Sequence, residues 1–490
     1  MTVSRKISRR RLLRRALGAG IGLPLFISCQ QQPASVRPTR VAGQPEDLEP
    51  GPDDKKPAGP NDQIGVGVIG CGRRNSQLTS QDPRVVKRSG HGRRPDYARI
   101  VAVADFNTRR AETWAKHYKC EAYQDYRSLL DRKDVDVVVY ATPEHQHYLP
   151  CIHAAQAGKD IYGEQPLSHT IREGRAMVEA VRRHKRVFQT GEQQRSHPVN
   201  RKAVELILNG RIGKIQKIIG YNYPSPFESN FPAQPIPPTL DWDRWCGPNE
   251  VVPYNVNIYL SRIPYEPEPV FSPAPAEETA SGPGWMSFRP YSGGELLNWG
   301  CHGLSAVQWV LGMDHSGPVE VWVDPAEKME TFVQDVPGVR DPGDAFCSRP
   351  VINYKYANGT VLTLSSFNPR VGSGATFIGD KGEITIMREK YECKPEGLDK
   401  DPLPADAIRV YKCDNHMQDF YDCVKSREDP IMNVENGHRV ATLCHLGNIA
   451  RWLGRPLKWD PKKEIFPGDD EANQYLDIPR RKGFELPEQV

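Results

Sequence analysis

Five short apolar runs alternate with helix-like segments between Gln63 and Gln194. The runs are Ile64–Ile69, Ala98–Ala104, Val135–Tyr140, Asp160–Tyr162 and Arg186–Gln189. The helix-like segments are Asp125–Arg132, His147–Ala157 and Ile171–His184. Such alternation is typical of a parallel sheet covered by helices on both faces. We therefore expect a doubly wound α/β domain over residues 62–190, with its ligand site at the carboxyl ends of the strands.

The first apolar run ends in Gly70-Cys71-Gly72, followed by Arg73. Glycines at this point let backbone N–H groups approach a pyrophosphate at a helix start. The third small position of the dinucleotide fingerprint is occupied by Asn75. A glycine pair alone is weak evidence, but its place after the first strand of an alternating pattern predicts a dinucleotide site.

Asp105 follows the second run, where a carboxylate can accept hydrogen bonds from ribose hydroxyls. Its charge favours NAD over NADP, because it would repel the 2′-phosphate of NADP. The spacing from Gly72 to Asp105 exceeds the usual separation of about 20 residues. We expect Ser80–Tyr97 to be an inserted surface loop that accounts for the excess. The alternative is that Asp105 only caps a helix near Thr108.

Polar residues also follow the next two strands. Glu164 and Gln165 come after Asp160–Tyr162, where catalytic groups of this architecture often lie. After Val135–Tyr140, Thr142 or Glu144 can instead cap the next helix. The residues expected to border the cofactor after Val135–Tyr140 are Thr142, Pro143, His145 and His147.

The second half, residues 191–460, predicts a different sheet. After a helix at Pro198–Asn209, the expected strands are longer and alternate in polarity: Lys214–Tyr223, Val319–Asp324, Ser348–Tyr356, Thr360–Phe367 and the hairpin Phe377–Met387. Asn358-Gly359 is a strong hairpin turn signal. We expect an α+β domain whose largely antiparallel sheet has one open face.

Two further segments of this half suggest ligand contact. The Pro-rich segment Pro224–Gly284 carries Trp242, Trp245, Tyr254, Tyr259 and Tyr265, which suit either a sugar platform or simple loop packing. A helical pattern opens at Gly293 and runs to Leu311, with Asn298 and His302 on one stripe. A lone histidine on such a face is more often structural than catalytic.

The amino-terminal residues resemble an export signal. Twin arginines in Ser8–Arg14 precede an apolar stretch, Ala16–Ile27, that is too short for a bilayer span of about 20 residues. We expect a signal over 1–29, export to the periplasm, and either no anchor or lipid attachment at Cys29, followed by a flexible linker over 30–61. The only membrane contact expected is through this signal or lipid.

Charge and cysteine content narrow the functional classes. Seven basic residues precede any acidic one, and without them the net charge of +4 becomes −3. Nothing in that balance favours a nucleic-acid partner. The cysteines after Cys29 form no CxxC pairs, so we expect buried apolar thiols and no metal site. We expect residues 461–490 to form a carboxyl-terminal tail.

These features together resemble the glucose–fructose oxidoreductase/inositol dehydrogenase (Gfo/Idh/MocA) superfamily, in its exported twin-arginine branch. The motifs that carry the resemblance are Gly67–Gly72, Ala141–His147, Glu164–Leu167, Gly191–Arg195, Leu240–Asp243, Gly300–His302, Phe377–Gly382 and Gly468–Asn473. The resemblance implies a Rossmann domain for NAD, an open-faced substrate domain, and a homo-oligomer formed through the open sheet. It also implies hydride transfer between the nicotinamide and a secondary alcohol of a small sugar or cyclitol.

The resemblance assigns roles to particular residues. His302, Gln165 and Asn298 take catalytic positions, and the substrate contacts are expected at Arg195, Tyr221, Trp242 and His302. The family usually carries lysine where this chain has Gln165, and often aspartate where it has Asn298. Neither amide accepts a proton at neutral pH. A general base contributes about 10²–10⁴-fold in rate.

Three functions remain open at this point. The first is an exported NAD-dependent oxidoreductase of carbohydrates. The second is glycoside cleavage by transient oxidation and elimination on a retained NAD, with Tyr221, Tyr223 or His302 as base. The third is a non-catalytic protein that binds carbohydrate or nucleotide.

Overall fold

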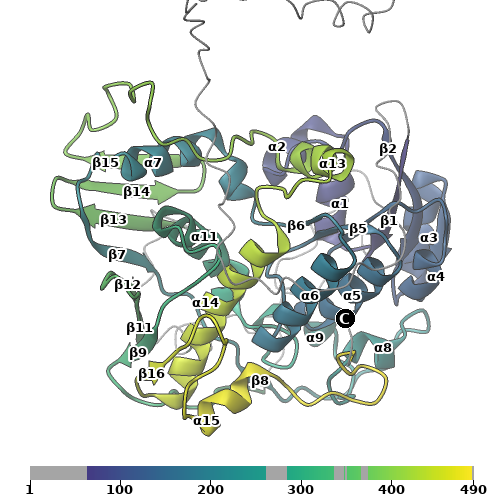
Figure 1. The fold of residues 1–490 in the computed structure, drawn as a ribbon. Helices are drawn as coiled ribbons and strands as arrows, with labels where there is room; N and C mark the ends of the chain where they lie inside the picture. The colour runs from purple at the N-terminus through teal and green to yellow at the C-terminus, as the bar shows by residue number, and fades with distance from the viewer. Residues whose placement is uncertain (1–62, 261–283, 336–346, 348–349, 366–373, 488–490) are drawn as a thin grey trace, which may run out of the picture. The chain divides into compact units, whose positions relative to one another are not determined.

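The computed structural model describes residues 63–260, 284–335, 347, 350–365 and 374–487, which contain two large sheets (Figure 1). The predicted signal over 1–29, the linker over 30–61 and Tyr265 lie outside the described residues. Within the described residues, no helix combines the length and apolar character needed to cross a bilayer.

The first sheet has six parallel strands in the order β3-β2-β1-β4-β5-β6. Its strands are β1 (Ile64–Ile69), β2 (Ala98–Ala104), β3 (Glu121–Tyr123), β4 (Val137–Tyr140), β5 (Asp160–Gly163) and β6 (Phe188–Thr190). The helices around it are α1 (Arg73–Thr79), α2 (Pro83–Ser89), α3 (Thr108–Tyr118), α4 (Tyr126–Leu130), α5 (Tyr148–Gln156) and α6 (Ile171–Arg183). The predicted doubly wound domain is confirmed.

Strand β1 forms because every residue in it is buried between helix layers. Each fully buried aliphatic side chain contributes about 1.5–3 kcal/mol. A Cβ at Gly65 would lie 1.7 Å from the carbonyl oxygen of Asp134, so this glycine permits the close approach of the chain before β4. The strand and its neighbour β2 match the predicted bounds because both are continuous apolar runs.

The second sheet has eight strands among the described residues, in the order β15-β14-β13-β7-β12-β11-β9-β16. They are β7 (Ile215–Tyr221), β9 (Glu320–Asp324), β11 (Val351–Lys355), β12 (Val361–Ser365), β13 (Ala375–Gly379), β14 (Glu383–Met387), β15 (Lys390–Lys394) and β16 (Leu457–Lys458). Only β7 and β12 pair in parallel. The expected hairpins at Asn358-Gly359 and Gly379–Gly382 are present. The mostly antiparallel sheet is therefore confirmed.

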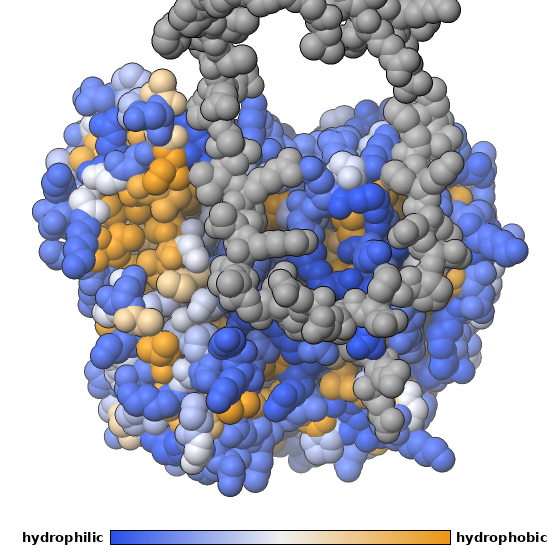
Figure 2. Space-filling view, in the orientation of Figure 1, coloured by the Kyte–Doolittle hydropathy of each residue, from blue (hydrophilic) through white to orange (hydrophobic). Residues whose placement is uncertain are grey.

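Helices cover one face of this second sheet (Figure 1). They are α7 (Pro198–Leu208), α11 (Gly300–Leu311) and α14 (Val434–Leu453), and they bury the largest apolar core. The other side chains of the strands, such as Ile219 and Ile378, remain partly exposed. Figure 2 shows apolar side chains gathered on the side of the molecule where β7 and β13 lie. The sheet thus has the open face that the sequence predicts.

Late segments of the chain also complete the first sheet. Helix α13 (His416–Ser426) places Met417, Phe420 and Tyr421 in the core against β1 and β2. Helix α14 is buried almost throughout because it packs on α6 and on the second sheet. The carboxyl-terminal segment folds back, and Arg480 lies 3.1 Å from Glu173 of α6. The packing units are therefore not contiguous in sequence.

The described part of the Pro-rich segment is a packed aromatic cluster. It contains β8 (Glu228–Ser229), α8 (Trp242–Cys246) and α9 (Val256–Tyr259). Trp242 stacks on Trp245 with ring centroids 4.6 Å apart. The remaining short elements are α10 (Glu295–Asn298), β10 (Val333–Gln334) and α15 (Asp470–Asn473). Most of the aromatic residues of this segment therefore serve loop packing, which the sequence left open as an alternative to a sugar platform.

The capping box of α6 provides a test of the fold. Thr170 accepts a hydrogen bond from Glu173 N at 3.1 Å, and the Glu173 carboxylate accepts from Thr170 N at 3.1 Å. Replacing Thr170→Ala should lower the free energy of unfolding by about 1 kcal/mol. Urea denaturation followed by circular dichroism measures the loss.

Ser128→Ala is the matched control, because Ser128 is exposed inside α4 and caps nothing. It should change the stability by less than about 0.5 kcal/mol. Equal stability changes in the two variants would show that the cap does not hold α6.

Candidate active site

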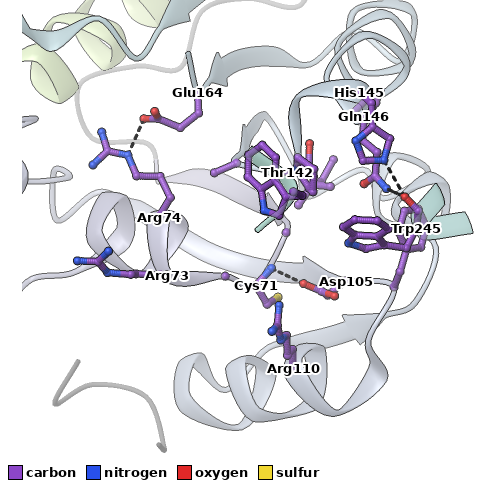
Figure 3. Close-up of a pocket in the computed structure, with 18 of the residues that line it drawn as sticks. Cys71, Arg73, Arg74, Asp105, Arg110, Thr142, His145, Gln146, Glu164 and Trp245 are labelled. Atoms are coloured by element: carbon purple, nitrogen blue, oxygen red, sulfur yellow. Dashed lines mark hydrogen bonds and ion pairs between the residues drawn. The ribbon is translucent and has the colours of Figure 1, made fainter. Parts of the chain in front are cut away.

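A cavity of about 510 Å³ lies at the carboxyl ends of the strands of the first sheet and reaches the start of α11. Figure 3 shows residues that line it. Its walls come from the loops after β1, β2, β4 and β5 and from residues of the second half of the chain. The structure brings these predicted site residues to the wall: Gly70, Cys71, Gly72, Arg73, Asp105, Thr142, Pro143, His145, Glu164, Gln165, Asn298 and His302.

The turn after β1 has the conformation that a dinucleotide site needs. Gly70 has a φ of 87°, and a Cβ there would lie 2.9 Å from the carbonyl oxygen of Ala141. Gly72 caps α1 without a side-chain bond and has open space in front of it. Asn75 donates to the carbonyl oxygens of Ile69 at 2.8 Å and Gly70 at 2.7 Å. Its amide therefore holds the turn where a third small residue was expected.

Asp105 joins the ends of β1 and β2. Its Oδ2 accepts a hydrogen bond from Cys71 N at 2.7 Å (Figure 3), and its Oδ1 accepts from Asn107 N at 2.8 Å. Asn107, not Asp105, is the N-cap residue of α3. The capping alternative is therefore wrong, and the carboxylate lies at the cavity wall beside the glycine turn.

The loop after β4 divides into residues that face the cavity and residues that hold the loop. His145 lines the cavity and lies 2.8 Å from the carbonyl oxygen of Trp245 (Figure 3). Burial lowers the pKa of His145 to about 3. His147 does not line the cavity, which corrects the prediction of a direct cofactor contact. Its ring nitrogens lie 2.9 Å from the carbonyl oxygens of Thr142 and Pro166, so it ties two strand-end loops together.

Glu144 binds the segment just before α10 and α11 to this loop. Its carboxylate accepts hydrogen bonds from Ser292 Oγ at 2.9 Å and Gly293 N at 2.8 Å. Burial raises the pKa of Glu144 to about 8. Neither Thr142 nor Glu144 caps a helix, because the short helix at 144–146 and α5 both lack side-chain caps. The capping alternative for this loop is therefore wrong as well.

Glu164 belongs to a charge cluster that also uses the inserted segment. Arg74 Nε lies 3.1 Å from Glu164 Oε1 (Figure 3), and His91 Nε2 lies 2.7 Å from the Arg74 guanidinium. Burial alone would raise the pKa of Glu164, but Arg74 and His91 hold it at about 2. Residues 80–97 are therefore no simple surface loop, since they contain α2 and the fully buried His91.

The predicted catalytic residues meet at the end of the cavity next to α11. Cys301 Sγ donates to Gln165 Oε1 at 2.8 Å, which leaves the amide nitrogen of Gln165 as the end available to a ligand. The helix predicted from Gly293 to Leu311 breaks into α10 and α11 at Trp299. Asn298 and His302 thereby both reach the cavity wall.

His302 is buried yet incompletely bonded. Its Nδ1 has no hydrogen-bond partner among the described residues. Burial first, and then the nearby positive charge of Arg388, lower the pKa of His302 to about 3. This pKa lies well below the ordinary value of a histidine, so the imidazole is unprotonated at physiological pH.

Three predicted substrate residues do not line the cavity, and their packing explains why. Arg195 is buried and forms an ion pair with Asp314 at 2.7 Å, which neutralises its charge. Tyr221 packs in the core of the second sheet. Trp242 is buried behind Trp245 and donates to the carbonyl oxygen of Val252 at 2.8 Å. The structure therefore corrects these three assignments, and of the stacked pair Trp242 and Trp245 only Trp245 lies at the cavity wall.

Sequence reasoning also missed several residues of the cavity. Arg388, in the turn between β14 and β15, and Trp299 lie near His302. Further wall residues outside the quoted motifs are Arg74, Arg244, Met286 and Phe484. Two missed residues had a usable signal: Gln193 lies within the motif Gly191–Arg195, and Trp299 directly precedes Gly300-Cys301-His302.

The polar atoms of the cavity match the needs of a dinucleotide. The glycine turn offers an uncapped helix start for a pyrophosphate, and Asp105 offers carboxylate lone pairs for ribose hydroxyls. Thr142 Oγ1 is buried at the wall without a partner among the described residues. No group of three or more metal-ligating side chains occurs in the described part of the chain, and the ten cysteines there are free thiols.

Family models match both parts of the chain. Residues 64–192 match the NAD-binding Rossmann fold of the Gfo/Idh/MocA oxidoreductase family, and residues 266–486 match the family's carboxyl-terminal alpha/beta domain. Together the two models cover more than half of the sequence.

Curated relatives match over shorter stretches. A levoglucosan dehydrogenase of Pseudarthrobacter phenanthrenivorans is 36% identical over 24% of this chain and 30% of its own length. An inositol 2-dehydrogenase of Rubrobacter xylanophilus is 30% identical over 32% of this chain and 42% of its own length. A 2,7-anhydro-N-acetylneuraminate hydratase of Mediterraneibacter gnavus is 30% identical over 31% of this chain and 37% of its own length. The chain thus spans less than half the length of these relatives.

Solved structures share the fold along most of the chain. A levoglucosan dehydrogenase with NADH and levoglucosan gives a TM-score of 0.51 at 18% identity, over 81% of this chain and 99% of the other. The WlbA dehydrogenase of Bordetella pertussis, with NADH and UDP-GlcNAcA, gives 0.51 at 15% identity over the same shares. At these identities the likeness shows the fold alone. With both family models matched and a cavity suited to a dinucleotide, the chain belongs to the Gfo/Idh/MocA family of NAD-binding oxidoreductases.

Proposed function

We propose that the protein oxidises a secondary alcohol of a sugar, cyclitol or related carbohydrate, with NAD as the hydride acceptor. One observation carries the proposal: a single cavity joins the glycine turn and Asp105 to Gln165, Asn298 and His302. The relatives named as dehydrogenases of levoglucosan and inositol support a carbohydrate substrate. Trp299 and Trp245 give the cavity aromatic walls of the kind that pack against sugar rings.

The side chains near α11 divide the work on the substrate hydroxyl. Gln165 holds its amide oxygen on Cys301 and donates from its nitrogen to the reacting oxygen. Asn298 orients the same hydroxyl, and His302 accepts its proton. NAD supplies the acceptor for the hydride when it is bound. Gln165 takes the place of the lysine that the family usually carries.

The low pKa of His302 sets the strength of this base. An imidazole whose pKa is about 3 is unprotonated at neutral pH and can accept a hydrogen bond from a hydroxyl. It accepts a full proton only at a cost, because each pKa unit below the ordinary value is about 1.4 kcal/mol. A bound group that offsets the charge of Arg388 would raise the pKa of His302 and strengthen the base.

A second candidate is cleavage or hydration through transient oxidation and elimination on a retained NAD. The match to a 2,7-anhydro-N-acetylneuraminate hydratase favours it. Tyr221 and Tyr223 do not line the cavity, so His302 is the base that this reaction would use. Both candidates begin with the same oxidation of the substrate. Membership of an oxidoreductase family argues against the third hypothesis, a non-catalytic protein.

Location and assembly form part of the same proposal. The twin arginines in Ser8–Arg14 support export to the periplasm by the twin-arginine route, with or without lipid at Cys29. The open face of the second sheet, with Ile219 and Ile378, supports a homo-oligomer built through that face. A folded protein that leaves the cytoplasm with NAD bound would keep its cofactor outside.

The assay that tests the function uses purified full-length protein and a panel of sugars and cyclitols. Sugar-dependent growth of NADH absorbance supports the oxidoreductase. Reducing sugar released from aryl glycosides without net NADH supports the elimination reaction instead. Retained or added NAD that is never reduced, with no product from either panel, would contradict both.

Asp105 should determine the choice of dinucleotide. In Asp105→Asn, the preference for NAD over NADP should fall about tenfold, because the carboxylate no longer repels a 2′-phosphate. Titration calorimetry with both dinucleotides measures the ratio. Glu112→Gln removes the same charge from an exposed position on α3 and should leave the ratio unchanged. An unchanged ratio in Asp105→Asn would place the ribose elsewhere.

His302 should act in turnover and not in cofactor binding. His302→Ala should lower kcat by about 10²–10⁴-fold and leave the Kd for NAD within about twofold. The wild-type rate should not fall from protonation of His302 on acidification to about pH 5, since its pKa lies well below that value.

The control for this variant is His315→Ala, in the loop after α11 and away from the cavity wall. It should keep the wild-type kcat. If His302→Ala also kept it, His302 would have no part in the proton transfer.

A further inference from the structure

The substrate end of the cavity holds an arginine that forms no ion pair within the part of the chain that the structure describes. Arg388 lines the cavity from the turn between β14 and β15, and its guanidinium carbon lies 5.8 Å from the centre of the Trp299 ring. No carboxylate of the described residues forms an ion pair with it. The adjacent Glu389 is exposed, and its negative charge raises the pKa of Arg388 without forming an ion pair or hydrogen bond with it.

The other charged groups at this end cancel one another. Arg74 forms its ion pair with Glu164 at 3.1 Å, and that carboxylate also contacts His91. His302, the remaining titratable group, is uncharged at neutral pH. Arg388 is therefore the excess cation beside the base.

The position of Arg388 disfavours its charged form. Burial first, and then the positive charge of Arg74, lower the pKa of Arg388, although a guanidinium remains charged at neutral pH. A partly desolvated charge is retained in proteins when a partner of opposite charge repays the lost hydration. An anionic ligand in the cavity would supply such a partner for the half-buried Arg388.

The cofactor does not provide that partner. Its pyrophosphate belongs at the glycine turn after β1, and its ribose belongs at Asp105. Arg388 comes instead from the second sheet and lies beside His302 and Trp299, where the substrate must lie for proton transfer to His302. The anion that faces Arg388 is thus part of the substrate.

We propose that the substrate is an acidic carbohydrate and that Arg388 binds its carboxylate, with the sugar ring against Trp299 and the reacting hydroxyl at His302. This inference rests on the proposed function for the position of the hydroxyl. A planar guanidinium fits a carboxylate with two parallel hydrogen bonds, which a neutral sugar cannot form. Arg388 is then a specificity-determining residue.

The test compares matched acids and neutral sugars by calorimetry on NADH-loaded protein. The probes are D-glucuronate and D-galacturonate, their parents D-glucose and D-galactose, and glucose 6-phosphate. Wild-type protein should bind an acid at least about tenfold more tightly than its parent sugar, since a hydrogen bond to a charged group contributes about 1.5–3 kcal/mol. Arg388→Leu should abolish this difference.

Two other variants separate charge from geometry and from folding. Lys390→Leu removes a cation from an exposed position at the start of β15, two residues from Arg388, and should keep the difference. Arg388→Lys keeps the charge, loses the paired hydrogen bonds, and should show an intermediate preference. This variant also tests the proposal if Arg388→Leu does not fold.

Each outcome bears on one proposal or the other. Equal binding of acids and neutral sugars, or no binding of any acid, would overturn the carboxylate site. Tighter binding of glucose 6-phosphate than of either acid would overturn the choice of a carboxylate over a phosphate. Binding of an acid that depends on Arg388, without NAD reduction on the oxidised protein, supports the carboxylate site and contradicts the dehydrogenase. If neutral sugars reduce NAD and Arg388→Leu leaves that reduction intact, the dehydrogenase is supported and the carboxylate site is contradicted.

Discussion

The buried carboxylate of Glu144 joins the two halves of the cavity. It belongs to the loop after β4, and it accepts hydrogen bonds from Ser292 Oγ and Gly293 N just before α10. These bonds fix the start of the segment that carries Asn298 and His302. A backbone hydrogen bond from His145 N to Tyr291 O at 3.3 Å joins the same two segments. The relation between the dinucleotide site and the proton acceptor therefore depends in large part on this pair of neighbouring residues, Glu144 and His145.

Charge pairing then decides what chemistry the cavity supports. Arg74 and His91 keep Glu164 ionised, so this carboxylate serves as a fixed anion and not as an acid. Gln165 is oriented by Cys301 and contributes hydrogen bonding without charge. Burial first, and then the positive charge of Arg388, lower the basicity of His302. If the substrate carries the proposed carboxylate, its binding at Arg388 would remove the second of these two effects.

The sequence was most informative where burial is uniform or a motif is local. Strands β1 and β2 were predicted to the residue because every position, or nearly every position, is apolar. Strand β3 was missed because Glu121–Tyr123 is short and partly exposed. Gly70, Asp105 and Gln165 were found because the carboxyl ends of parallel strands meet at one edge of a sheet.

Contacts between distant segments could not be predicted in the same way. His91 reaches Glu164 from an insertion, and Arg388 reaches the cavity from a β-turn, with no local pattern to mark either. Trp242 and Trp245 are equivalent candidates in sequence, and only the folded structure shows that Trp245 reaches the wall while Trp242 stacks behind it. Arg195 was misassigned because its partner Asp314 lies 119 residues away.

The central claim is that a single cavity holds NAD with its reactive ring facing His302. A crystal structure of the NADH complex tests this claim most directly. The account predicts the pyrophosphate at Gly70–Gly72, a ribose on Asp105, and the nicotinamide between Gln165 and His302. A nicotinamide directed away from α11, or separated from His302 by protein side chains, would contradict it.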